Sequence, residues 1–145
     1  MSSFEAQVDA WVRKSERRME AIRKEAAQRV IQEALRPVGE GGRMRVDTGF
    51  LRASGQISTA SMPRIDLAAT PSEEATYTVD EGAIAAVIAG ADAEDTIYFG
   101  FTASYAAARE YGARGQAPDA FVRGAADQWQ TIVRTVTAEA KARFP

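Results

Sequence analysis

The stretch Asp47-Thr48-Gly49-Phe50-Leu51-Arg52-Ala53-Ser54 is the most informative part of this chain of 145 residues, and it follows a glycine-rich loop. Either of its first two residues can cap a helix that starts near the glycine, because their side-chain oxygens accept hydrogen bonds from backbone amides. Phe50 and Leu51 supply an apolar side, and Arg52 stays on the polar side. Taken alone, the stretch predicts a capped helical turn.

A long amphipathic helix is expected before this turn. Ser2 and Glu5 have the spacing of a capping box, which predicts a helix from about residue 3 to Pro37. Past Val30 the apolar residues Ile31, Ala34 and Leu35 leave the main apolar face, which predicts contact with a second surface such as a neighbouring subunit. The main face is about 100° wide and consists of Phe4, Val8, Trp11, Val12, Ser15, Met19, Ile22, Ala26 and Val30.

A second long helix is expected at the end of the chain. Asp119 can cap it, and the helix should run almost to Pro145. Its apolar residues repeat at steps of three and four, the mark of one buried stripe: Phe121, Ala125, Trp129, Ile132, Val136 and Ala140.

The middle of the chain predicts strands and a second short helix. Residues 56–62, 76–79, 84–90 and 95–101 have strand-like patterns, and residues 104–111 predict a short helix that ends at Gly112. Residues 37–45, with three glycines, predict a mobile loop. The expected fold is therefore α+β: a single domain over residues 1–145, in which two long helices pack on a small, mostly antiparallel sheet of three or four strands, with two short helices.

The composition argues against an enzyme and against a metal or other cofactor. Cysteine and histidine are both absent, which removes thiol nucleophiles, disulfides, Cys/His zinc sites and the commonest general base. The acidic residues Asp92, Glu94 and Asp95 lack the spacing of a calcium loop, and the pairs Glu73/Glu74 and Asp80/Glu81 have no partner for paired acid and base chemistry. No apolar stretch is long enough to span a bilayer and no secretory signal is visible, so synthesis in the cytoplasm is expected.

Charge is unevenly distributed along the chain, although the net charge is only −2. Residues 1–52 hold 11 Lys/Arg and 8 Asp/Glu, residues 53–112 hold 2 and 9, and residues 113–145 hold 5 and 3. The middle segment, with a net charge of −7, is thus the acidic one. Such asymmetry bears on partners and says little about the fold.

Two charged groups allow more than one interpretation. Arg109 and Glu110 can pair with Arg52 or Asp47, either to lock the two short helices together or to form an interface. The first helix also carries a basic group near Trp11, which leaves a small nucleic-acid-binding or regulatory domain as an alternative. Intervening Glu16, Glu20 and Glu25 largely neutralise that group, which consists of Arg13, Lys14, Arg17, Arg18, Arg23 and Lys24.

Three short motifs together resemble the tail-completion family of long-tailed bacteriophages, the small tail-terminator or head-tail joining proteins of the phage neck. The first motif is Val46 to Ser54, and the second is Tyr105-Ala106 with Glu110 and Gly112. The third is Ala117-Pro118 with Phe121 and Arg123 before Ala125, so the resemblance covers the chain in order.

This resemblance implies a structural virion protein that forms a ring, most often a hexamer. The ring would end the tail tube and join it to the head-tail connector on the capsid, with DNA only as passing cargo. The protein would reside in the neck of the virion and, during assembly, in the host cytoplasm. No membrane partner is implied.

Two sets of residues follow as candidate contact sites. The first set is expected at subunit or partner interfaces and comprises Gly39, Glu40, Gly41, Gly42, Arg43, Met44, Arg45, Arg52, Arg109 and Glu110. The second set is expected to line the channel, where like-charge repulsion would keep DNA from adhering; it comprises Glu73, Glu74, Asp80, Glu81, Asp92, Glu94 and Asp95.

Overall fold

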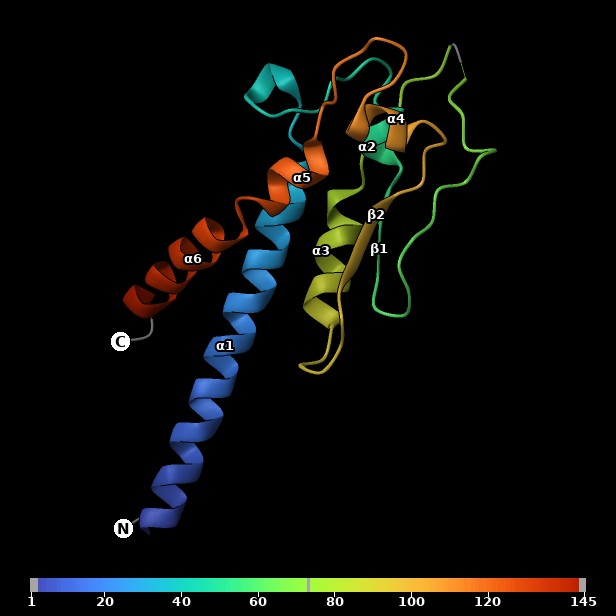
Figure 1. Cartoon of the computed structure of the whole chain (residues 1–145). Coiled ribbons are helices and arrows are strands. Elements are labelled where there is room, and N and C mark those ends of the chain that lie inside the picture. Colours follow the sequence, from blue (N-terminus) through green and yellow to red (C-terminus); the bar gives the residue numbers. More distant parts are fainter. Residues whose placement is uncertain (1–2, 73, 144–145) are drawn as a thin grey trace.

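The fold is α+β, with helices around a small antiparallel sheet (Figure 1). The computed structural model describes residues 3–72 and 74–143. In chain order the elements are α1 (Phe4–Leu35), η1 (Val38–Glu40), α2 (Phe50–Ala53), β1 (Gly55–Ser58), α3 (Glu81–Gly90), β2 (Tyr98–Phe101), α4 (Ala106–Tyr111), α5 (Phe121–Ala126) and α6 (Trp129–Arg143).

Helix α1 is the longest element and forms the spine of the molecule. Its N-cap is Ser3, whose hydroxyl accepts a hydrogen bond from the amide of Ala6 at 3.1 Å; the predicted capping box involves Ser2, which lies outside the described residues. The helix ends before Pro37, because proline disfavours helical geometry at the residue before it. With 32 residues α1 extends for about 48 Å.

Within residues 3–72 and 74–143, the sheet has two strands and not the three or four expected. β1 and β2 pair antiparallel, with Gly55 opposite Phe101 and Ser58 opposite Tyr98. β1 is shorter than the predicted strand over residues 56–62, and β2 is shorter than the one over residues 95–101. Residues 76–79 form no strand, and their backbone is held to the chain before α2 by the bond from the Tyr77 amide to the Thr48 carbonyl at 2.9 Å.

The predicted strand over residues 84–90 is instead part of helix α3. Asp80 caps this helix, since its carboxylate accepts from the Ala83 amide at 2.9 Å. Ile84 and Ile88, one helical turn apart, are the buried residues of α3. A short apolar run does not distinguish a strand from a helix by periodicity, and here the N-cap decides.

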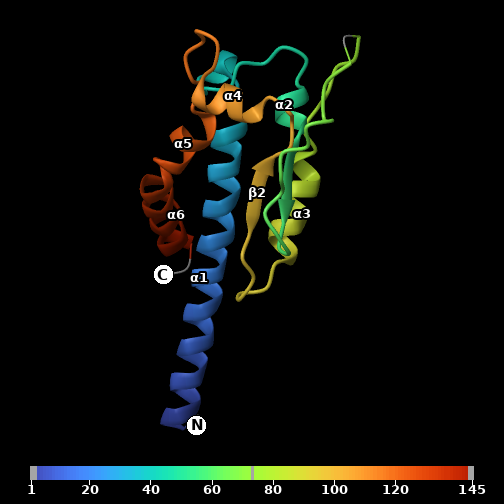
Figure 2. The same ribbon diagram turned by 45° about the vertical axis from the view of Figure 1, so that its right-hand side comes forward.

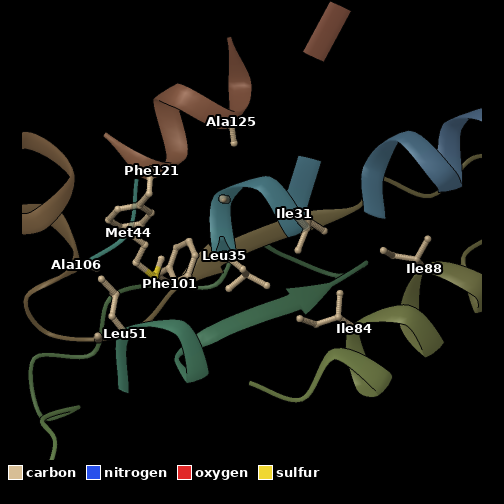
Figure 3. Close-up of a cluster of buried hydrophobic side chains, with 12 residues drawn as sticks. Ile31, Leu35, Met44, Leu51, Ile84, Ile88, Phe101, Ala106, Phe121 and Ala125 are labelled. Carbon is tan, nitrogen blue, oxygen red and sulfur yellow. The ribbon is translucent and has the colours of Figure 1, made fainter. Parts of the chain in front are cut away.

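The core lies between α1, the sheet, α3 and α5 (Figure 3). Ile31 and Leu35 of α1 pack there, together with Ala34. The expected second surface is therefore present, but it belongs to the same chain and not to a neighbouring subunit. Other members of the core are Met44, Leu51, Ile84, Ile88, Phe101, Ala103, Ala106, Phe121 and Ala125.

The predicted C-terminal helix is divided into α5 and α6 by a turn at residues 127–128. The expected stripe is largely confirmed: Phe121, Ala125, Val136 and Ala140 are buried, whereas Trp129 remains exposed. α6 lies along the upper half of α1 and runs in the opposite direction (Figures 1 and 2). Arg29 and Glu139 join the two helices by an ion pair at 2.5 Å.

The glycine-rich loop over residues 37–45 is better anchored than its composition predicts. Met44 is fully buried in the core, and its carbonyl accepts from the Val38 amide at 2.9 Å. η1 and the turn after it therefore form a small closed arm above the end of α1 (Figure 1).

Gly49 occupies a position that only glycine fits. Its φ is +85°, in the left-handed region, and it precedes the first residue of α2. A Cβ atom here would also overlap the carbonyl oxygen of Tyr77. Both the backbone angle and the close approach of the 76–79 segment thus require the absence of a side chain.

We expect Gly49→Ala to reduce the free energy of unfolding by about 2–4 kcal/mol, through backbone strain and the displacement of Tyr77. Urea unfolding followed by circular dichroism measures this. The matched control is Gly90→Ala at the exposed end of α3, where a Cβ meets no atom within 4 Å. It should be neutral or stabilising by up to about 1 kcal/mol, and equal effects of the two substitutions would contradict this account.

Candidate interaction surfaces

The turn over residues 47–54 connects three parts of the structure. Arg52 donates from Nε to the carbonyl oxygen of Leu35, the last residue of α1, at 2.7 Å. The carbonyl of Ser54 accepts from the amide of Thr102, just after β2, at 3.1 Å. The ring of Phe50 packs edge-on against Tyr77, with centroids 4.9 Å apart. α1, the 76–79 segment and the sheet thus all meet at this turn.

The same turn contacts α4, which contains the second motif. The Phe50 and Tyr105 rings lie 6.3 Å apart between centroids. Burial raises the pKa of the Tyr105 hydroxyl above its ordinary value. The N-cap residue of α2 is Gly49, and not Asp47 or Thr48 as expected. The Thr48 hydroxyl accepts a hydrogen bond from the Phe50 amide at 3.3 Å.

Glu110 of α4 caps α5 from outside that helix. Its carboxylate accepts from the amides of Val122 and Arg123, both at 2.9 Å, and from Nε of Arg123 at 3.0 Å. The side chain is only 7% exposed. A buried carboxylate is tolerated here because amides at a helix N-terminus and a guanidinium surround it. Asp119, which was expected to cap this helix, does not; the N-cap residue is Ala120.

Asp119 instead joins the glycine-rich arm to α4. Its carboxylate lies 2.6 Å from Nε of Arg45 and 3.7 Å from Nη1 of Arg109. The expected pairing of Arg109 and Glu110 with Arg52 or Asp47 is therefore wrong. Asp119 and Arg123, in the segment that leads into α5 and in its first turn, are closer partners because that segment folds back over α4.

The predicted interface residues divide into two groups. Met44 is buried, and Arg45, Arg52, Arg109 and Glu110 are engaged in the contacts within this chain described above. The arm itself remains available, because Gly39, Glu40, Gly41 and Arg43 are exposed, with Gly42 half-buried.

A cleft lies between the 47–54 turn and the loop that follows α4. It has a volume of about 600 Å³ and is lined by residues of two motifs, among them Asp47, Thr48, Tyr105 and Arg109, together with Arg114 and Gln116 of that loop. Residues that define the resemblance thus border an open surface as well as a packed junction.

Five of the acidic residues expected to line the channel lie in two groups at opposite ends of α3. Asp80 and Glu81 are at its start, and Asp92, Glu94 and Asp95 follow its end. The ten residues between them correspond to about 15 Å. Glu74 is exposed, and Glu73 lies outside the described residues. Within the described ranges, no group of three or more Asp or Glu side chains is arranged to hold a metal ion.

The basic side of α1 is partly used to hold the loop between α3 and β2. Arg23 donates to the carbonyls of Asp95 at 3.1 Å and Asp92 at 2.9 Å, and it forms an ion pair with Glu20 at 2.8 Å. Lys24 donates to the carbonyl of Ala89 at 2.9 Å. Among the helices that the structure describes, none is long and apolar enough to cross a membrane.

The first half of α1 carries an exposed apolar stripe, defined here as Phe4, Val8, Trp11, Val12 and Met19. The sequence predicts this face correctly but not its exposure: Phe4 is 81%, Trp11 69% and Met19 68% exposed. In two views this half of the helix projects beyond every other element (Figures 1 and 2). Amphipathic periodicity shows that a helix has an apolar face to bury, but it does not show whether the same chain or another one buries it.

Comparisons with known proteins give no identification, since no family model, curated protein or solved structure matches this chain.

We expect Glu110→Gln to destabilise the fold by about 2–4 kcal/mol, since a carboxamide places an NH₂ group against a backbone amide and leaves Arg123 without its charge partner. Thermal or urea unfolding measures the effect. Glu94→Gln, at an exposed loop position, is the control and should change stability by less than about 0.5 kcal/mol. A similarly small effect at Glu110 would show that its carboxylate does not hold α5.

The pKa of Glu20 is lowered, first by its hydrogen bonds from Arg23. A lowered folded-state pKa contributes stability above the unfolded value, about 4.3, and this contribution is lost as pH falls through the folded value. We expect Glu20→Gln to cost about 0.5 kcal/mol at pH 7, and this cost should shrink at an acidic pH well below the unfolded value. Urea unfolding at both pH values tests this, with Glu16→Gln on an exposed part of the same helix as control; a loss that persists at low pH would refute the ion-pair explanation.

Proposed function

We propose that this chain is a structural protein of the neck of a long-tailed bacteriophage, prophage or gene-transfer particle. Several copies form a ring, with six as the number that the resemblance implies. The ring ends the tail tube and joins it to the head-tail connector. Localisation in the virion, and in the host cytoplasm during assembly, belongs to the same proposal.

The observation that carries this proposal is the convergence of the three motifs in space. The 47–54 turn contacts α4 through Phe50 and Tyr105, and α4 caps α5 through Glu110. The first motif, which 50 residues separate from the second, thus forms one junction with the other two at the upper end of the molecule. A resemblance spread over separate surfaces would have offered no common structural reason for these residues.

Exposed features around this junction are suited to contacts between copies. The arm over residues 38–43 stands at its edge, and the 600 Å³ cleft opens beside it. A ring requires two different surfaces on each copy, because heterologous contacts repeat head to tail until they close. The arm of one copy and the cleft of the next are the pair that we assign to this contact.

We also propose that the two acidic groups beside α3 line the channel of the ring. The two acidic groups flank α3, so a ring that directs α3 inward would present two acidic belts about 15 Å apart. Passing DNA would be repelled by both belts. A ring structure with α3 on the outside would exclude this role.

A nucleic-acid-binding domain finds less support in the contacts of α1. Residues 3–20 contain four basic side chains and four acidic ones, so this half of the helix has no net charge. Arg23 and Lys24 are held by carbonyls of the α3–β2 loop. Affinity for DNA at low salt would favour this alternative over the neck protein.

Negative-stain microscopy of the purified protein, and imaging of particles assembled without it, test the proposal. We expect rings in the first case, and filled heads separate from finished tails in the second. Normal particles without this protein would refute the proposed function.

A charge reversal on the arm tests the assigned contact. Arg43→Glu should abolish ring formation. Thermal unfolding checks that the fold survives, because the exposed Arg43 side chain also lies against Gly124 of α5. Arg64→Glu, at another exposed position away from the arm, is the matched control and should leave rings intact. Rings that persist in Arg43→Glu would exclude the arm from the contact.

A further inference from the structure

The exposed apolar stripe of α1 continues a face that the chain itself covers farther along the helix. Ala26, on the same face, has no exposed surface, and Val30 packs against the core. α6 lies along this upper part of α1, where Arg29 pairs with Glu139 (Figure 2). Because α6 runs opposite to α1 and ends four residues after Glu139, its contact with α1 ends about one turn before Arg29, and the stripe lies beyond that point.

The charges around the stripe argue against an anionic membrane or a nucleic acid as its binding partner. Four basic residues, Arg13, Lys14, Arg17 and Arg18, are balanced by Glu5, Asp9, Glu16 and Glu20. Anionic membranes and nucleic acids both attract helices with a basic excess, which this half of α1 lacks. An apolar face with balanced charges fits another amphipathic helix.

The spacing of the stripe is symmetric about its own centre. Together with Ser15, its residues occupy positions 4, 8, 11, 12, 15 and 19. Each position added to its counterpart gives 23, so an antiparallel second copy places Phe4 beside Met19, Val8 beside Ser15, and Trp11 beside Val12. Large side chains thereby meet apolar or small ones along about 24 Å of helix.

The charge gradient along α1 favours the antiparallel direction. Residues 3–9 contain Glu5 and Asp9 and no basic residue, whereas residues 13–18 contain four basic residues and one acidic residue. Antiparallel copies place the acidic segment of one beside the basic segment of the other. Parallel copies place the two acidic segments side by side and the two basic segments side by side. The first turn of the second copy, with Glu5, also points toward the last turn of α6, which carries Lys141 and Arg143.

We propose that the stripe is an interface between two copies of this chain, whose α1 helices pair antiparallel about a two-fold axis near Trp11 and Val12. Each copy keeps its globular part at the opposite end of the pair, so the two bodies do not compete for space. The five stripe side chains can bury on the order of 500 Å² per copy, which gives roughly 1,000 Å² in total and reaches the lower limit of specific interfaces. This pairing concerns the free chain and does not depend on the ring proposed above.

The absence of cysteine makes a cross-linking test direct. Val8→Cys and Ser15→Cys are prepared separately, and each protein is oxidised alone and in an equimolar mixture. In the antiparallel pair, identical positions lie about 10 Å apart along the axis, beyond the limit of about 7 Å between the Cα atoms of a disulfide. We therefore expect the disulfide dimer mainly in the mixture. Ala10→Cys with Arg13→Cys, which also add to 23 but lie on the opposite face, is the matched control and should not cross-link.

Sedimentation velocity over a range of concentrations supplies a second readout. We expect a monomer–dimer equilibrium, weakened at least about tenfold by Trp11→Glu, because an exposed aromatic at the centre of an interface is the typical energetic hot spot. At a concentration low enough for both proteins to be monomeric, thermal unfolding of this variant should match the parent, since Trp11 is exposed within its own chain.

Each outcome decides the matter separately from the neck function. A monomer at every concentration, or a mixture that cross-links no more than the control pair, overturns the pairing. Strong cross-linking of Ser15→Cys alone indicates parallel helices and also overturns it. If the protein forms rings but no antiparallel cross-link, the neck function stands and the pairing fails. If the antiparallel cross-link forms but particles without this protein are normal, the pairing stands and the neck function fails.

Discussion

The hydrogen bond from Arg52 to the carbonyl of Leu35 is the contact on which the upper part of the molecule depends. The last carbonyls of a helix have no partner within the helix, and Leu35 is buried away from water. A side chain must therefore satisfy this carbonyl, and Arg52 does so from the 47–54 turn. The turn is thereby fixed at the end of α1, and contacts from Ser54 to Thr102 and from Phe50 to Tyr105 place β2 and α4 around it.

Local patterns predicted the elements whose ends and faces are set by neighbours in sequence. The periodicity of α1, the stripe of the last helices and the end of α4 before Gly112, with its positive φ, follow from such patterns. The apolar run over residues 84–90 misled, because a continuous run carries no period and the decisive group, Asp80, lies just before it. One missing strand follows from the same error. The other is missing because residues 76–79 bond to the chain before α2 through Tyr77 and do not pair with the sheet.

Contacts between distant residues could not be predicted in this way. Nothing near Val122 and Arg123 indicates that their amides bond to Glu110 across a loop, since a local acid, Asp119, was available. The exposure of Phe4 and Trp11 also could not be predicted from neighbouring residues. Helical spacing identified them as one face, but only the full arrangement of α6 beside α1 shows that this face extends past its cover.

The projecting half of α1 also has a thermodynamic consequence for its own conformation. A helix of about 16 residues without packing is only marginally stable in water, because few interactions offset the loss of backbone entropy. Here the buried half of α1 supplies the nucleus, so the projecting half only has to extend existing turns. Whatever covers the stripe therefore stabilises helix and contact together, and part of its binding energy appears as protection of the amides of residues 4–19 from exchange with solvent.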